Sequence, residues 1–207
     1  NAEGVDPKAP GLEAGRRSRR DQSPSHIGPH VLELCAAADI VFLGLHGMDG
    51  EDGRIQAALD LLNVPYTGAG HLASAVAMDK AVAKRLMDAA GIRTPKGRLL
   101  VFGPEEVERL AAVLPLPCLV KTLGGGSSLG VYLPEDRAEL RSALAEVLDY
   151  GARVLMEERI FGRELTVAVL GDRWLPAVET VPAGEDFDYE AKNQAGAAVE
   201  TCPAQVP

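Results

Sequence analysis

Three lysines in this 207-residue sequence stand where a positive charge could meet a phosphate. Lys80 opens a predicted helix, Lys121 ends an apolar run, and Lys192 lies in a polar loop. A nucleoside triphosphate carries about four negative charges near neutrality, and lysines from separate elements are one way to hold it. A lysine taken alone is more often a solvated surface residue, so the three count only together.

Lys121 is followed by a glycine-rich loop, Gly124-Gly125-Gly126-Ser127-Ser128, which lies between two apolar runs. Glycines let backbone N–H groups approach an anion, and the two serines add hydroxyl donors. The spacing is not that of a P-loop, because no Gly-Lys-Ser/Thr follows the glycines. By itself the loop fits either an ordinary surface turn or a cover for a phosphate.

Carboxylates follow a second apolar run at residues 154–156. Glu157 and Glu158 end that run, and Glu164 begins the next one. A carboxylate can accept a hydrogen bond from an adenine amino group or from ribose hydroxyls. The alternative is a solvated strand end, which is the commoner setting for a lone glutamate.

A third group follows the apolar run at residues 40–45, which is typical of a buried parallel strand. His46 and Glu51 lie in the polar loop after it, and α/β folds place ligands at the carboxyl ends of parallel strands. The start of the next helix, near Gly53, can attract an anion. His46 is equally compatible with a structural role in which its hydrogen bonds are satisfied.

Hydrophobic periodicity predicts the elements that position these residues. A strand at 40–45, an amphipathic helix at 55–62 and an extended piece at 64–68 form a βαβ-like unit, which indicates an α/β domain. The turn Gly171-Asp172 predicts a hairpin, so the second half should be a mixed α+β region. We also expect helices near 31–35, 79–90 and 134–150 and one from Pro104, and strands at 97–101, 117–121, 131–133, 154–157, 164–170, 174–181 and from 197.

Composition narrows the class of protein. The net charge of −9 argues against nucleic acid or an anionic membrane as the main partner. No apolar run approaches the ~20 residues that a membrane span needs. The three cysteines, Cys35, Cys118 and Cys202, are odd in number and widely spaced, so reduced thiols in a cytoplasmic protein fit better than disulfides or a zinc site. Residues 1–27 are polar and lack periodicity, and we expect them to be disordered or loosely packed.

The order of the motifs is more specific than any one of them, and it resembles the D-alanine–D-alanine ligase family, which belongs to the ATP-grasp superfold. The resemblance covers nearly everything from residue 40 onward. The motifs that carry it are Leu45-His46-Gly47 with Gly50-Glu51-Asp52-Gly53, Met78-Asp79-Lys80, Val120-Lys121 with Gly126-Ser127-Ser128-Leu129-Gly130-Val131, Leu155-Met156-Glu157-Glu158, Gly162-Arg163-Glu164 and the strand after it, and Phe187-Asp188-Tyr189-Glu190-Ala191-Lys192.

The resemblance implies a fold and a domain order. It implies a partial N-terminal βαβ domain at 28–78, a central ATP-grasp subdomain at 79–157 and a partial C-terminal ATP-grasp subdomain at 158–207. Two α+β regions of this kind clamp ATP between them in the family. The class is therefore α/β and α+β, with residues 1–27 as a loose leading segment.

The resemblance also implies residue roles. Lys80 and Lys121 resemble the lysines that bind ATP phosphates, and Ser128 resembles a loop residue over the γ-phosphate. Glu157 is similar to the adenine acceptor, and Glu164 to the ribose ligand. Residues implied to line the base are Glu158 and Ile160.

For the amino-acid side of the reaction, the resemblance implies that Ser127 faces the first D-alanine. It implies that Lys192 belongs to a second mobile loop that covers the reaction. Contacts near the amino-acid site are implied for His46 and Glu51. Asn193 stands where the family usually has a tyrosine that supports the serine loop and influences the second substrate.

The implied activity is ATP-dependent ligation of two D-alanines to D-alanyl-D-alanine, through an acyl phosphate, for peptidoglycan precursor synthesis. The implied partners are D-alanine, ATP, two Mg²⁺ ions and a second subunit in a cytoplasmic homodimer. Asn193 leaves open a D-alanine–D-lactate or D-alanine–D-serine ligase, and a non-catalytic nucleotide-binding ATP-grasp protein is a further alternative. Two other departures are Thr122, where the family often has proline, and the three successive glycines, which predict a more mobile loop.

The two ends of the sequence lack features that the family carries. Nothing in residues 1–39 reads as the family's first strand and Gly-rich turn with its glutamate. The family's Arg and its Mg²⁺ ligands Asp, Glu and Asn are expected beyond Pro207. We therefore expect an internal fragment of a ligase that does not catalyse the reaction alone.

Overall fold

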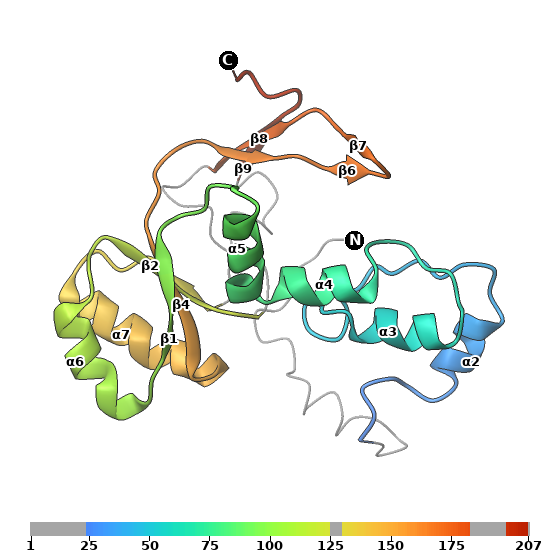
Figure 1. Cartoon of the computed structure of the whole chain (residues 1–207), viewed down its shortest axis with the longest axis horizontal. Coiled ribbons are helices and arrows are strands. Elements are labelled where there is room, and N and C mark those ends of the chain that lie inside the picture. The colour runs from blue at the N-terminus through green and yellow to red at the C-terminus, as the bar shows by residue number, and fades with distance from the viewer. Residues whose placement is uncertain (1–23, 125–129, 183–197, 207) are drawn as a thin grey trace. The chain divides into compact units, whose positions relative to one another are not determined.

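The computed structural model describes residues 24–124, 130–182 and 198–206 (Figure 1). The chain divides into two compact units, Asn1–Ala75 and Val76–Pro207, here called the first and second unit. Ser127, Ser128, Lys192 and Asn193, to which the sequence assigns roles, lie outside the described residues, as do residues 1–23.

The first unit contains short helices joined by loops. Helix α2 spans Val31–Ala36 and α3 spans Arg54–Leu61, close to the predicted ranges. Gly53 precedes α3 with φ of 88°, and an added Cβ there would lie 2.3 Å from the carbonyl oxygen of His71, so the position requires glycine. Helix α4, His71–Met78, begins in this unit and continues past its last residue, Ala75, into the second unit. The sequence does not predict it, because its small and apolar residues show no clear polar face.

The prediction of a buried strand at 40–45 is wrong. Val41 makes one parallel bridge to Tyr66, with hydrogen bonds from Val41 N to Pro65 O (2.8 Å) and from Thr67 N to Val41 O (3.0 Å). Phe42 is 82% exposed, whereas Val41 and Leu43 are half-buried. A strand buried on both faces needs other elements packed against each face. Side chains alternate along an extended run, so Val41 and Leu43 share one face and Phe42 lies on the other. Only the face of Val41 and Leu43 is partly covered.

The second unit is built on a four-stranded antiparallel sheet of order β1-β4-β2-β3. The strands are β1 (Gly97–Val101), β4 (Arg153–Glu158), β2 (Cys118–Thr122) and β3 (Val131–Tyr132). All four occur where the sequence predicts strands. The central pair β4–β2 places Lys121 opposite Leu155 and Leu119 opposite Glu157.

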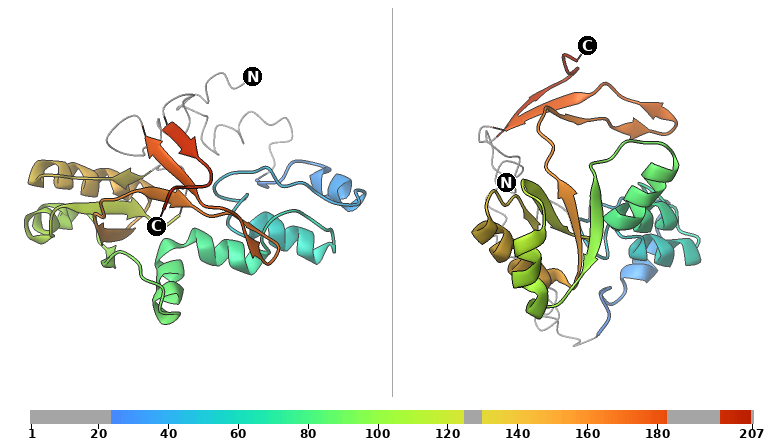
Figure 2. Two further views of the ribbon diagram at one scale, coloured as in Figure 1. Left: turned by 90° about the horizontal axis from the view of Figure 1, so that it is seen from above. Right: turned by 60° about the vertical axis from the view of Figure 1, so that its left-hand side comes forward.

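Two helices cover one face of this sheet. Pro104 opens a 3-10 turn, Pro104–Glu106, which leads into α6, Val107–Val113. Helix α7, Arg137–Val147, is capped by Asp136 and followed by the turn Leu148–Tyr150. These helices lie side by side against the sheet (Figures 1 and 2). Their buried core also includes strand residues; its fully buried members are Leu114, Leu140, Leu144, Val147, Val120 and Val154.

Helix α5, Lys80–Ala89, lies on the other face. Ala81 from this helix packs in a small core with Leu123 and Leu155. The predicted apolar face of the helix is only partly buried, because Leu86 is 54% exposed and Met87 is 43% exposed. Side chains alternate along a strand. Leu155 and Glu157 of β4 therefore point toward α5, whereas Val154 and Met156 point toward α6 and α7.

The C-terminal part of the second unit forms two further sheets. Strands β5 (Glu164–Thr166), β8 (Val178–Pro182) and β9 (Ala198–Thr201) make a three-stranded antiparallel sheet. Strands β6 (Val169–Leu170) and β7 (Arg173–Trp174) form the predicted hairpin, with Gly171 at φ of 64°. The predicted strands 164–170 and 174–181 are thus each interrupted. Trp174 on β7 is 81% exposed.

Candidate functional site

A buried carboxylate held by two lysines lies on the α5 face of the four-stranded sheet. Glu157 is 6% exposed. Its Oε1 is 3.0 Å from Lys84 Nζ, and its Oε2 is 2.5 Å from Lys121 Nζ. A buried carboxylate is stable only when its charge is paired, and the two ammonium groups supply that pairing.

Three elements bring these groups together. Lys121 and Glu157 lie diagonally on the adjacent strands β2 and β4, a separation that long side chains can span. The first turn of α5 is fixed by Asp79, whose Oδ1 accepts from the backbone N–H groups of Ala81 and Val82, both at 3.0 Å. The cap places Lys80 at the start of the helix, and Lys84 follows one turn later on the same side.

Gly97 of β1 allows the sheet to close around Glu157. It pairs directly with Glu157, and a Cβ added at Gly97 would lie 2.5 Å from the carbonyl oxygen of Met156 and 2.6 Å from Glu157 Cγ. Any side chain at this position would therefore displace the carboxylate or its strand.

Lys80 lies next to this cluster. Its Nζ donates to the carbonyl oxygen of Leu123 at 3.2 Å, and its backbone N–H donates to the same oxygen at 3.3 Å. Burial lowers the pKa of the Lys80 ammonium, and the neighbouring charge of Lys121 lowers it further, whereas Asp79 opposes both. The structure thus brings together three of the predicted residues, Lys80, Lys121 and Glu157, in a site with more positive than negative charge.

Lys84 is the member of the cluster that sequence reasoning missed. Besides Glu157 it donates to Thr94 Oγ1 at 2.7 Å and to the carbonyl oxygen of Pro95. The signal that could have identified it is its position four residues after Lys80, which places both lysines on one side of a helix.

The other residues predicted to bind the nucleotide lie outside the cluster of Glu157, Lys84 and Lys121. Glu158 is exposed and accepts from the backbone N–H of Lys96 at 2.7 Å. Ile160 is 63% exposed, and Glu164 is exposed at the start of β5. Among the described residues, the ion-pair partners of Glu157 are Lys84 and Lys121, so the structure does not join these three residues to the cluster.

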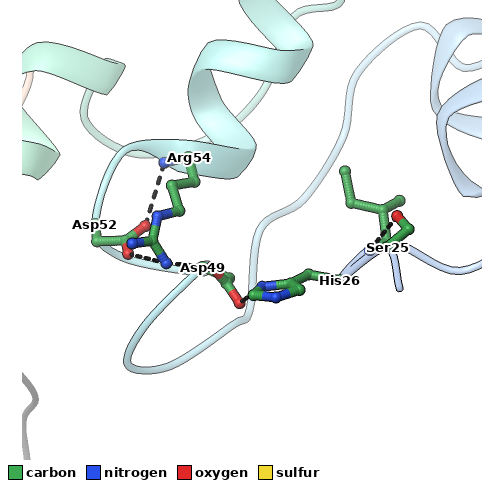
Figure 3. Close-up of polar contacts among 6 residues, drawn as sticks. Ser25, His26, Asp49, Asp52 and Arg54 are labelled. Atoms are coloured by element: carbon green, nitrogen blue, oxygen red, sulfur yellow. Dashed lines mark hydrogen bonds and ion pairs between the residues drawn. The ribbon is translucent and has the colours of Figure 1, made fainter. Parts of the chain in front are cut away.

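In the first unit, the loop after residues 40–45 forms a second polar cluster. The backbone N–H of Gly47 donates to Glu51 Oε2 at 2.6 Å, so Glu51 fixes the turn that follows His46. Asp49 binds Arg54 Nη1 at 2.6 Å and His26 Nδ1 at 2.5 Å, and Arg54 also contacts Asp52 (Figure 3). His46 is exposed and, with His26, Asp49 and Arg54, lines a pocket of about 490 Å³.

Sequence reasoning missed His26, Asp49 and Arg54. His26 is separated from Asp49 by 23 positions, and nothing in a single sequence indicates that pairing. Arg54 at the start of α3 was visible, but its partner was not. Within this unit Gln56 is also buried, with its Nε2 donating to the carbonyl oxygen of Gly50 at 2.8 Å.

Neither a metal site nor a membrane span is found within the described ranges. Across residues 24–124, 130–182 and 198–206, no three His, Cys, Asp or Glu side chains gather in a way that could hold a metal ion. Over the same residues, every helix is too short or too polar to cross a bilayer. Cys35, Cys118 and Cys202 are free thiols.

The α+β architecture is that of the ATP-grasp fold, which the similar solved structures share, and comparisons with known proteins identify the family. A sequence model described as "D-ala D-ala ligase C-terminus" matches residues 97–207, more than half of the chain. A second, described as "D-ala D-ala ligase N-terminus", matches residues 3–69, which includes most of the segment expected to be loose. The chain belongs to the D-alanine–D-alanine ligase family.

Individual relatives agree with this assignment. The chain is 45% identical over 168 residues to the D-alanine--D-alanine ligase of Gloeobacter violaceus, covering 80% of this chain and 56% of that protein. Among solved structures, the ligase from Bacillus anthracis matches with 34% identity and a TM-score of 0.69, covering 85% of this chain and 58% of that chain. The same enzyme complexed with ATP matches with 30% identity and a TM-score of 0.68, covering 86% of this chain and 56% of that chain.

A relative whose name gives a different second substrate is also similar. The VanG D-Ala:D-Ser ligase from Enterococcus faecalis matches at 34% identity and a TM-score of 0.68, covering 82% of this chain and 51% of that chain. The chain thus spans between half and two thirds of the length of these relatives.

Proposed function

We propose that the protein containing these 207 residues ligates two D-alanine molecules at the expense of ATP, through an acyl phosphate, for peptidoglycan precursor synthesis. The observation that carries the proposal is the pairing of Lys84 and Lys121 with the buried Glu157, with Lys80 beside them on the carbonyl oxygen of Leu123. A site with excess positive charge and one fixed carboxylate suits a nucleotide, whose phosphates are anionic and whose adenine carries an amino group.

For the nucleotide, we assign the phosphates to Lys80 and Lys121 and the adenine amino group to Glu157. Both lysines are partly buried, and a charge in a region of low dielectric interacts more strongly than one in water. Glu158 and Ile160 line the base in this proposal, and Glu164 binds the ribose. Ser128, in the glycine-rich loop, closes over the γ-phosphate.

For the amino acids, we assign contacts residue by residue, as the family resemblance implies them. His46 and Glu51 contact the substrate from the loop of the first unit, and the bond from Gly47 N to Glu51 supports a fixed loop there. Ser127 faces the first D-alanine, Lys192 covers the reacting groups, and Asn193 contributes to acceptor choice. An acyl phosphate hydrolyses readily, so loops that exclude water are needed.

The remaining proposals concern partners, location and domains. We propose that two Mg²⁺ ions neutralise the triphosphate and that the enzyme is a homodimer in the cytoplasm. The three free thiols support a reducing compartment. We also propose the domain boundaries 28–78, 79–157 and 158–207.

The test is to purify the protein encoded by the complete reading frame that contains these residues. With ATP, Mg²⁺ and D-alanine we expect phosphate release in step with D-alanyl-D-alanine formation. Lys121→Met should lower kcat/KM about a hundredfold, since it removes a charge from the transferring phosphate. Absence of dipeptide in the wild type would contradict the proposal.

The acceptor is a separate question, because Asn193 replaces the expected tyrosine and a D-Ala:D-Ser ligase is among the similar structures. The second candidate function is therefore ligation of D-alanine to D-serine or D-lactate. Comparing kcat/KM for D-alanine, D-serine and D-lactate as second substrate distinguishes these candidates. A protein that binds ATP but releases no phosphate with any of them is the non-catalytic alternative.

A further inference from the structure

The ammonium group of Lys84 has three partners around it. It donates hydrogen bonds to Thr94 Oγ1 at 2.7 Å and to the carbonyl oxygen of Pro95, and it forms an ion pair with Glu157 Oε1 at 3.0 Å. Thr94 in turn donates to Asp88 Oδ1 at 2.9 Å, so the acceptor is itself held in place. An ammonium has only three donors. With two of them engaged, the third beside Glu157 and a side chain that is only 13% exposed, Lys84 is poorly placed to bind a ligand.

Lys121 is in a different position. Its side chain is 21% exposed, and within the described residues its partner is the Glu157 carboxylate, whose Oε2 lies 2.5 Å from Lys121 Nζ in an ion pair. Two of its three donors are therefore left for other groups. Lys121 is also the lysine whose charge acts on the half-buried Lys80. An incoming anion would relieve that repulsion.

Glu157 cannot easily release both lysines. A carboxylate that is 6% exposed needs a compensating charge, because an unpaired buried charge is strongly destabilising. If Lys84 were absent, Lys121 would be the remaining partner and would have to stay. With Lys84 in place, Glu157 keeps one cationic partner even when Lys121 leaves it.

Resting on the proposed function, we propose that Lys84 is a positioning residue: it stays bound to Glu157, so that Lys121 can exchange Glu157 for a nucleotide phosphate. Lys121 then alternates between two anions, and Lys84 makes that exchange possible without touching the nucleotide. No bond is made or broken in this step; only ion pairs are exchanged.

The experiment follows each lysine separately. The protein from the complete reading frame is reductively methylated with and without ATP, and the rate at each lysine is read by mass spectrometry. In the wild type we expect ATP to slow methylation of Lys121 about tenfold, the scale of one charged hydrogen bond. Lys84 should react slowly under both conditions. Protection of Lys84 itself by ATP would overturn the proposal, because Lys84 would then be a phosphate ligand.

The variant Lys84→Met tests whether the exchange at Lys121 depends on Lys84. Lys121 should then react slowly even without ATP, ATP should change its rate little, and ATP should bind about tenfold more weakly. Lys84→Met with Glu157→Gln removes the carboxylate that retains Lys121, so the ATP protection of Lys121 should return. Full protection of Lys121 in Lys84→Met, or no return in the double variant, would contradict the exchange. If Lys84→Met acted only by removing a positive charge, ATP would bind more weakly, but the methylation rate of Lys121 in the free protein would not change.

Two variants serve as controls. Lys96→Met removes an exposed lysine whose side chain is outside the cluster, and it should behave as the wild type. Glu157→Gln alone keeps Lys84 and replaces the buried carboxylate with a neutral amide. This variant therefore remains informative if Lys84→Met does not fold. It should speed methylation of Lys121 in the free protein, and an unchanged rate would contradict the proposal. If the wild type binds no ATP, the proposed function fails instead.

Discussion

Asp49 in the first unit has side-chain partners in two directions, Arg54 at the start of α3 and His26 in the preceding segment (Figure 3). The hydrogen bond from Arg54 holds the pKa of the Asp49 carboxyl below its ordinary value; partial burial opposes this shift, and His26 adds to it. A depressed carboxyl pKa means that the folded state favours the ionised form. The resulting stabilisation is complete above the unfolded pKa of about 3.9 and is lost as the pH falls through the folded value.

Asp49→Asn should therefore destabilise the first unit near about pH 5, and the difference from the wild type should shrink as the pH falls through the folded pKa of Asp49 towards about pH 2. Asparagine tolerates the backbone φ of 68° at this position, so the change tests charge rather than strain. Urea titrations at the two pH values, followed by helical circular dichroism, measure the difference. Asp39→Asn is the control, since Asp39 is exposed. An equal loss of stability at both pH values would contradict this account.

Gly97 gives a prediction about space rather than charge. In Gly97→Ala the new methyl group would lie 2.5 Å from the carbonyl oxygen of Met156, so β1 or β4 must shift, at a cost of about 1–3 kcal/mol. Gly162→Ala is the matched control, because no atom lies within 4 Å of its added Cβ and its φ is not positive. The free energies of unfolding of the two variants should differ by that amount. Equal values would show that β4 yields freely at Glu157.

At the scale of residues, the sequence predicts which side chains belong to a site better than it predicts which side chains pair with each other. Lys80, Lys121 and Glu157 were predicted as one site, and the structure brings them together. Lys84 was passed over because most lysines are solvated, and only the fold shows that its ammonium reaches three acceptors. The separations in sequence between His26 and Asp49 and between Lys84 and Glu157 leave no local pattern to detect.

At the scale of elements, the last turn of α7 offers a matched test of burial. Val147 ends α7 and is fully buried, whereas Val113 ends α6 and is 65% exposed. Val147→Ala removes two buried methyl groups and should cost about 2 kcal/mol of unfolding free energy. Val113→Ala should cost well under half of that, since little apolar area is lost. Chemical denaturation compares the two, and similar costs would contradict the burial of Val147.

Elements with local signals were predicted closely. Helix α7 has a capping aspartate, Asp136, and a regular apolar face ending in Val147, and both are visible in the sequence. Helix α4 has neither, so it was missed. The run at residues 40–45 was predicted as a buried strand because periodicity reports apolar character but not the presence of neighbours. Its surroundings supply one bridge at Tyr66 and leave Phe42 exposed.

At the scale of the whole molecule, the two units differ in their cores. In the described part of the first unit the buried apolar residues are Leu59 and Val64, whereas the second unit holds the large cluster between its sheet and the helices α6 and α7. Local stability follows buried apolar contact. Amides of α7 and the central strand β4 should therefore exchange with solvent at least about a hundredfold more slowly than those of α3. Hydrogen exchange read by mass spectrometry measures this, and equal protection would indicate a single cooperative unit.

Trp174 gives the molecule a built-in optical probe. It is the sole tryptophan in the sequence, and it stands 81% exposed on the β6–β7 hairpin, away from the large core cluster. Its emission should resemble that of indole in water and should stay nearly constant while the four-stranded sheet unfolds. A binding partner that covers the hairpin would instead shift the Trp174 emission to shorter wavelengths. Fluorescence of this chain thus reports what docks on one hairpin and is silent about its core.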